Sequence, residues 1–164
     1  MAVRDTYSNF KYYQAIAPVN RDANGDALNG VDIDTRGYEG VTLVVTTGVV
    51  ESMTTSTASY YCFMLQHTNA SALGNGPSDY AYVANCKHII HSVHSTGATD
   101  LTSGIWEPTV NGDDHGSMAY TIGYIGPKRY VRVVLSGTED AASINIGAIA
   151  VLGYPANWPV NTPA

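Results

Sequence analysis

The chain has 164 residues, of which 45% are hydrophobic and only 13% are charged. Eight Lys and Arg stand against fourteen Asp and Glu, so the formal net charge is −6. This balance argues against a protein that gains affinity by neutralising phosphates or anionic lipid headgroups, so we expect neither nucleic acid nor a membrane as partner. The apolar content is too high for a disordered chain, and the length suits one domain with a full core.

The N-terminal sequence and the cysteine content favour a protein that is made and folded in a cytoplasm. The first ten residues are polar from the start and lack the apolar stretch of a signal peptide. No apolar run approaches the ~20 residues needed to cross a bilayer. The two cysteines, Cys62 and Cys86, are too few for a disulfide framework. We expect buried free thiols, with a single bridge between them as the alternative.

The N-terminal third predicts β-strands. Short β-branched and aromatic runs alternate with clusters of Gly, Asn, Asp and Pro, and helical periodicity is almost absent. The first predicted strand covers residues 9–17 and ends at Pro18. The second covers residues 28–34, and a turn follows at residues 36–40. Alternation over residues 41–46, with valine and leucine on one face and threonine on the other, predicts a half-buried strand.

The middle of the chain is less regular. Residues 58–67 are apolar on both faces, which predicts a central strand or one covered by a neighbouring subunit. Residues 80–85 predict a short strand. Residues 96–117 predict mostly loop, interrupted by Ile105 and Trp106.

The C-terminal third is the most regular part. Strands are predicted over residues 118–125, 130–135 and 143–152, with a tight turn at Gly126-Pro127. Eight or nine strands favour an all-β fold, an antiparallel two-sheet β-sandwich of jelly-roll type.

We expect this sandwich to cover residues 14–153, between an extended N-terminal arm (1–13) and a proline-rich C-terminal tail (154–164). Aromatic side chains in unanchored termini need a partner, so these two arms should contact neighbouring subunits or a larger assembly. The aromatic candidates are Tyr7, Phe10, Tyr12, Tyr13, Tyr154 and Trp158.

Three histidines, His88, His91 and His94, lie at a spacing of three residues. On a short helix they could share one face and bind zinc or nickel. The flanking isoleucines and valine favour a strand or an irregular segment, which would place His91 on the opposite face from the other two. We therefore interpret them as exposed or interface histidines and predict no metal or other cofactor.

Enzymatic signatures are absent from the sequence. Asp113-Asp114-His115 has the residue types of acid–base chemistry, but it lies in a glycine-rich stretch where polar residues serve turns. There is no nucleophile elbow, phosphate-binding glycine loop, zinc-hydrolase helix or EF-hand series. The sequence therefore predicts a protein without catalytic activity.

Two groups of side chains are candidates for binding. Lys128, Arg129 and Arg132, with Tyr130, form the only basic cluster of an acidic chain, which favours docking to carboxylates of a partner. The tyrosines, with Trp106 and Trp158, could instead form a stacking platform for sugars, although aromatic faces serve protein interfaces more often.

Three stretches together resemble a known family. Residues 31–45 (Val-Asp-Ile-Asp-Thr-Arg-Gly-Tyr-Glu-Gly-Val-Thr-Leu-Val-Val) resemble the Asp-x-Arg-Gly-Tyr-x-Ala-Val strand of small structural proteins of tailed bacteriophages. Residues 123–134 (Gly-Tyr-Ile-Gly-Pro-Lys-Arg-Tyr-Val-Arg-Val-Val) resemble their Gly-Tyr-x-Gly-x-Lys-Arg-Tyr-x-Arg stretch. Residues 150–155 are similar to their last strand. The stretches cover about a fifth of the chain; residues 48–117 carry no motif of the family.

The resemblance implies a head decoration (cement) protein. Such proteins sit as trimers on the outer surface of the capsid, bind the major capsid protein and brace the shell. Arg36 and Tyr38 open one matching strand and Lys128, Arg129 and Tyr130 open the other, so these side chains are the expected anchors at strand ends. The alternatives are a carbohydrate-binding module, a tail- or fibre-associated protein of the phage particle and, third, a small enzyme.

Overall fold

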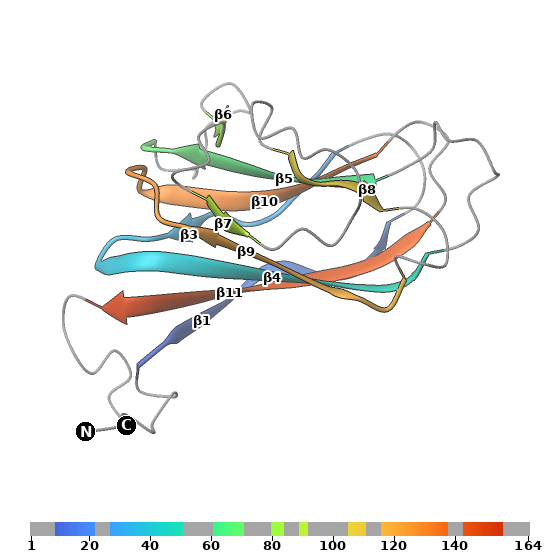
Figure 1. Cartoon of the computed structure of the whole chain (residues 1–164), viewed down its shortest axis with the longest axis horizontal. Helices are drawn as coiled ribbons and strands as arrows, with labels where there is room; N and C mark the ends of the chain where they lie inside the picture. The colour runs from blue at the N-terminus through green and yellow to red at the C-terminus, as the bar shows by residue number, and fades with distance from the viewer. Residues whose placement is uncertain are drawn as a thin grey trace.

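The computed structural model describes residues 9–21, 27–50, 61–70, 80–83, 89–91, 105–110, 116–137 and 143–155 (Figure 1). These ranges hold no helix that is long and apolar enough to span a membrane. Their regular elements are eleven strands. The strands are β1 Lys11–Arg21, β2 Leu28–Asn29, β3 Ile33–Asp34, β4 Tyr38–Val50, β5 Tyr61–Thr68, β6 Ala81–Tyr82, β7 Ile89–His91, β8 Ile105–Val110, β9 Ala119–Tyr124, β10 Tyr130–Gly137 and β11 Ile144–Pro155.

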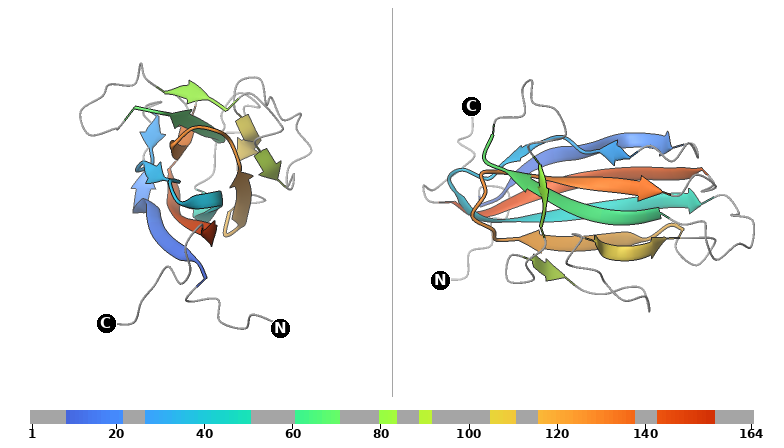
Figure 2. Two further views of the ribbon diagram at one scale, coloured as in Figure 1. Left: turned by 90° about the vertical axis from the view of Figure 1, so that its left-hand side faces the viewer. Right: turned by 90° about the horizontal axis from the view of Figure 1, so that it is seen from above.

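The strands form two antiparallel sheets that pack face to face, as Figures 1 and 2 show. The five-stranded sheet has the order β1-β11-β4-β9-β7. The six-stranded sheet has the order β2-β10-β5-β6, with β3 also paired to β10 and β8 to β5. The predicted all-β, two-sheet sandwich is confirmed, while the strand order does not establish the finer jelly-roll topology.

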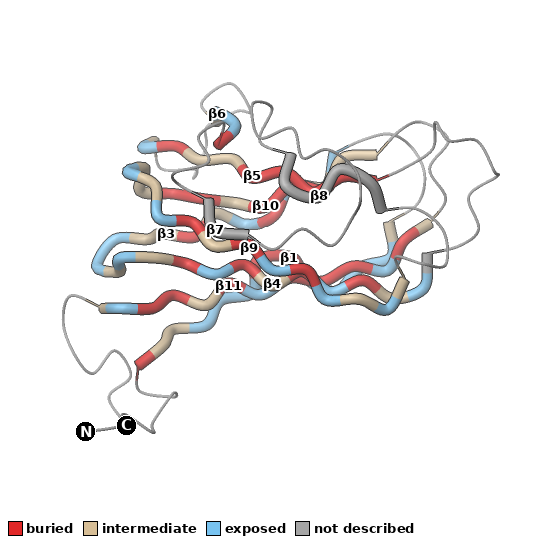
Figure 3. Tube along the Cα trace, viewed as in Figure 1, coloured by how far each residue is buried: buried red, intermediate tan, exposed pale blue. Residues whose placement is uncertain are grey.

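The core lies between the two sheets, where Figure 3 shows buried residues along the facing strands. Val41, Leu43 and Val45 are at most 3% exposed while Thr42 and Thr46 face outward, which confirms the predicted alternation. Contacts between the sheets include an edge-to-face pair of Phe63 and Tyr120, with ring centroids 5.1 Å apart.

Strand β1 runs three residues beyond the predicted end at Pro18, so that prediction is wrong. Among the described strands, β1 pairs with β11 and forms the edge of its sheet. The pairing shifts register between Ile16 and Val19, and Pro18 falls within this irregularity. An edge strand tolerates a residue without an N–H because no ladder bond is lost on its free side.

The single strand predicted over residues 28–34 is two short strands, β2 and β3, both paired with β10. Between them the Gly30 N–H donates to the Val133 oxygen (2.9 Å) and the Val31 N–H donates to the Ala15 oxygen (2.8 Å). This segment therefore joins the edges of the two sheets, as the end view in Figure 2 shows. A Cβ at Gly30 would lie 2.8 Å from both the Ala15 and Val133 oxygens, so only glycine fits there.

Strand β5 is central in its sheet, as predicted, and is buried on both faces. Phe63 and Leu65 face the core, while Cys62 and Met64 pack on the other side with Val134. Cys62 and Met64 are only 7% and 9% exposed in the single chain. The second face of β5 therefore needs no neighbouring subunit to cover it, which removes the argument for a trimer that this strand offered.

Several strand boundaries differ from the predictions. The short strand expected over residues 80–85 is only Ala81–Tyr82, and β8 (Ile105–Val110) occupies part of the expected loop. β1 begins at Lys11 and β11 continues to Pro155. The boundaries expected for the sandwich, at residues 14 and 153, thus lie inside these two strands.

Candidate interaction sites

The two longer stretches that carry the resemblance meet at one corner of the sandwich. Strand β3 pairs with β10, with Asp34 opposite Tyr130. The Thr35 N–H and hydroxyl both donate to the Arg129 oxygen, at 2.8 and 2.9 Å. The turn at Arg36-Gly37 follows directly, with Gly37 at a φ of 87°. Two segments far apart in sequence thus form one unit, called the β3–β10 corner below.

Arg129 is held within this corner. Its Nε lies 3.2 Å from Asp34 Oδ1 and its Nη2 lies 2.8 Å from Asp34 Oδ2, a two-pronged ion pair. Its guanidinium also stacks over the Tyr130 ring, 4.7 Å from the centroid. The hydrogen bond from Arg129 is the main reason why the pKa of Asp34 lies below its usual value of 3.8.

Arg132 is also engaged within the chain. Its Nε and Nη2 donate to Gln66 Oε1, at 3.0 and 2.8 Å, and its guanidinium lies 3.6 Å from the centroid of the Tyr80 ring. The Tyr80 hydroxyl in turn donates to Asp32 Oδ1. Burial, followed by this bond, raises the pKa of Tyr80, so the phenol stays neutral.

Arg36 is the most accessible of the predicted basic anchors, with its side chain 71% exposed. Its ion pair with Asp34 Oδ2, at 3.6 Å, is long and weak. Lys128 is half-buried on the neighbouring turn. Of the predicted aromatic anchors, Tyr38 is half-buried and Tyr130 is only 9% exposed, so both pack mainly within the chain.

The turn that carries Lys128 is fixed by Tyr124, a residue that the sequence analysis did not select. The Tyr124 hydroxyl accepts a hydrogen bond from the Lys128 N–H (3.2 Å) and lies 2.9 Å from His67 Nδ1. Burial raises its pKa to about 12. His67 is 57 residues away in sequence, so no local pattern could have paired the two.

A second candidate site is a hollow on the outer face of the five-stranded sheet. Three outward-facing glycines from neighbouring strands lie at its floor: Gly153 of β11 is paired with Gly40 of β4, and Thr42 of β4 is paired with Gly123 of β9. Because glycine has no side chain, the sheet is left bare at Gly40 and Gly123, while Phe10 covers Gly153. The result is a hollow of about 690 Å³, called the glycine hollow below.

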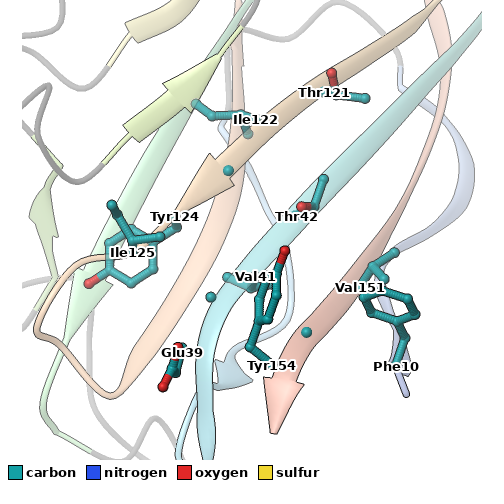
Figure 4. A pocket seen from close by; sticks show the side chains of 13 residues that line it. Phe10, Glu39, Val41, Thr42, Thr121, Ile122, Tyr124, Ile125, Val151 and Tyr154 are labelled. Atoms are coloured by element: carbon teal, nitrogen blue, oxygen red, sulfur yellow. The ribbon is translucent and has the colours of Figure 1, made fainter. Parts of the chain in front are cut away.

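Figure 4 shows the walls of the glycine hollow. Phe10 packs across Gly153 on one side, where a Cβ would lie 3.0 Å from the ring. Tyr154 projects from the end of β11 toward β4 and is 75% exposed. Ile125 lies on the far side, 49% exposed. Glu39 is the one charged residue among the described residues that line the hollow.

The backbone of Tyr154 is unusual. Its φ is 53°, in the left-handed region, which is uncommon for a bulky side chain. Of the other arm aromatics, Tyr12 and Tyr13 lie in β1 at 50% and 38% exposure. Tyr7 and Trp158 lie outside the described residues.

The remaining sequence candidates give no site within the described residues. Strand β7 includes His91, opposite Ile122 of β9, whereas His88 and His94 lie outside the described part. The described residues contain no group of three or more His, Cys, Asp or Glu that could hold a metal ion. Cys62 is a buried free thiol whose pKa burial raises to about 11, and Cys86 lies outside the described ranges. Asp113, Asp114 and His115 also lie outside them.

Comparison with known proteins adds no assignment: no protein-family model matches the chain, and no curated protein matches its sequence.

Proposed function

We propose that the chain is a structural protein of a tailed-bacteriophage particle, a decoration protein that binds the outer surface of the head and stabilises it. The observation that carries this proposal is the β3–β10 corner. The two matching stretches lie far apart in the sequence, yet they pair strand to strand and are joined by the Arg129–Asp34 ion pair. They therefore behave as one structural signature, which supports a resemblance of fold over two chance matches.

The same corner offers a surface for the capsid. Arg36 extends from the turn into solvent, and the adjacent Thr35 hydroxyl reaches the Lys128 oxygen at 3.4 Å, in a chain whose net charge is −6. Local positive charge on an acidic domain suits a docking contact with carboxylates of the major capsid protein. Arg129 and Arg132 take a supporting role in this proposal, because their partners lie within the chain.

Trimer formation belongs to the proposal through the resemblance alone, since the chain itself covers strand β5. Closed cyclic symmetry would suit attachment at a three-fold position of a capsid. Sedimentation of the purified protein at micromolar concentration tests this directly. A trimer is expected; rings of six or twelve would favour a tail or connector protein instead.

The decisive experiment mixes the purified chain with expanded heads of the phage that encodes it, prepared without this protein. Decoration should appear by cryo-electron microscopy as extra density on the outer surface, and decorated heads should resist heat or chelator better than bare heads. Absence of binding to such heads, across low and moderate salt, would refute the proposal.

A further inference from the structure

The strand conformation does not require glycine at the floor of the glycine hollow. The glycine described with a positive φ is Gly37, so Gly40, Gly123 and Gly153 adopt backbone angles that other residues also adopt. Glycine within a strand weakens it, and often marks a place where another group approaches closely. At Gly153 that group is Phe10.

Gly40 has no such neighbour. A Cβ there would meet the Ile125 Cγ2 at 3.5 Å and the Tyr124 oxygen at 3.6 Å, which are ordinary contacts. A larger residue would therefore fit and would fill the hollow. The bare floor leaves a space of about 690 Å³, within the usual size range of ligand sites.

Tyr154 supplies an aromatic wall under strain. The residue is 75% exposed, so packing of its side chain within the chain contributes little, while its φ of 53° is unfavourable for a bulky residue. Strained residues persist where the surrounding structure fixes them, and they concentrate at binding sites. An exposed and strained tyrosine in the wall of the glycine hollow points to a ligand that stacks on its ring.

The other lining groups define the chemistry of that ligand. Thr42 and Thr121 are exposed on the outer face and bring hydroxyl groups, and Glu39 brings an exposed carboxylate. The rest of the lining is apolar. A ligand that suits all of these has an apolar face for the ring and hydroxyl donors at its edges.

We propose that the glycine hollow binds an uncharged oligosaccharide, with one sugar ring stacked on Tyr154 and its hydroxyls donating to Glu39. An apolar side chain of a protein partner fits less well, because it would bury the threonine hydroxyls and the Glu39 carboxylate without partners. An acidic sugar is disfavoured by Glu39 and by the net charge of −6. The proposal does not rest on the proposed head-binding function.

Isothermal titration calorimetry with the full chain measures oligosaccharide binding at this site. The probes are cellotetraose, maltotetraose, mannotetraose and N-acetylchitotetraose, with tetragalacturonate as the acidic comparison. At least one neutral probe should bind. Tyr154→Ala and Gly40→Val should each weaken that binding at least tenfold, the first by removing the ring and the second by filling the hollow.

Two matched variants serve as controls. Tyr12→Ala removes another exposed tyrosine, which lies on the same face of the sheet but outside the hollow. Gly147→Ala adds a methyl group elsewhere on β11, in ordinary contact with Pro18 at 3.6 Å. Both should bind the probe like the unmodified chain. Thermal unfolding confirms that each variant is folded; if Gly40→Val is not, the Tyr154→Ala result decides.

The proposal is overturned if none of the four neutral probes binds, if Tyr154→Ala binds as tightly as the unmodified chain, or if tetragalacturonate binds more tightly than every neutral probe. Loss of head binding in Tyr154→Ala with no sugar binding in the unmodified chain would identify the hollow as a protein contact, which also overturns it. Failure to bind heads with sugar binding intact would refute only the proposed function.

Discussion

Arg129 and Asp34 lie 95 residues apart in the chain and form a two-pronged ion pair that ties the start of β10 to the end of β3. The adjacent Thr35 reinforces the tie through two hydrogen bonds to the Arg129 oxygen. Because Arg36 follows immediately, this pair also fixes the base of the turn that presents Arg36 to solvent. A contact that stabilises the fold thus also positions the proposed capsid contact.

The ion pair makes stability depend on pH. The folded-state pKa of Asp34 is depressed below 3.8, so its contribution is present above that value and is lost as the pH falls through the folded pKa. We expect Asp34→Asn to lower the melting temperature at about pH 6, with the difference from the unmodified chain shrinking as the pH falls below 3.8. Thermal unfolding, monitored by circular dichroism, measures the melting temperatures of the two proteins at each pH. A difference that is constant over this range would show that the pair does not stabilise the fold.

Tyr124 should be important for the turn that carries Lys128. Tyr124→Phe leaves the Lys128 N–H without its acceptor and should reduce the free energy of unfolding by about 1–3 kcal/mol. Urea unfolding measures the change. Tyr12→Phe is the matched control and should be neutral, because Tyr12 is 50% exposed.

The Tyr124 phenol also makes stability depend on pH in the alkaline range. The pKa of Tyr124 is raised from 10.0 to about 12, so the folded state retains its proton longer and stability falls as the pH rises through this interval. The difference between the unmodified chain and Tyr124→Phe should therefore narrow above pH 10. A difference that grows instead would contradict the assigned burial.

Cys62 should be inert in the folded protein. Burial disfavours its thiolate, and the pKa of about 11 leaves almost none at neutral pH. In a Cys86→Ser background, so that only Cys62 can react, alkylation by iodoacetamide should be on the order of 100-fold slower in buffer than in urea. Equal rates in the two conditions would show that the second face of β5 is open to solvent.

The sequence predicts strands well where one residue pattern decides the structure. Alternation at residues 41–46 predicts part of β4, because burial of one face repeats every second residue. Prediction from the sequence fails where the position of a segment in the folded protein decides its structure. Because proline lacks an N–H, Pro18 is expected to end a strand, yet the edge position of β1 allows the strand to continue. Likewise, Gly30 divides β2 from β3 only because two other strands approach it.

The candidate sites follow the same rule. The basic cluster could be found by composition, but the partners of Arg129 and Arg132 come from strands and segments far away in the chain. The glycine hollow could not be found at all, because its floor depends on the register of β9, β4 and β11. Three isolated glycines in sequence become one surface only when these strands are aligned.

Arg36 should contribute to head binding more than Arg129 does. Arg36→Ala removes an exposed cation with only a weak internal partner, so the melting temperature should stay nearly unchanged while affinity for expanded heads falls about tenfold or more. Arg21→Ala, at the opposite end of the sandwich, is the control. Equal affinity of Arg36→Ala and the unmodified chain, measured by co-sedimentation at low and moderate salt, would remove the β3–β10 corner from the capsid contact.

Tyr154 should be retained at a cost to stability. Because its φ of 53° suits glycine and the residue is 75% exposed, Tyr154→Gly relieves backbone strain and loses little packing. Strain of this kind costs about 1–3 kcal/mol, and glycine gives back roughly 0.5–1 kcal/mol through the greater freedom of the unfolded chain. We therefore expect Tyr154→Gly to be as stable as the unmodified chain or up to about 2 kcal/mol more stable, and Tyr154→Ala, which keeps the strain, to be no more stable than the unmodified chain. Urea unfolding of the three proteins measures these differences in the free energy of unfolding. A loss of more than about 1 kcal/mol in Tyr154→Gly would mean that the ring is kept for packing, and the argument from strain to binding would fail.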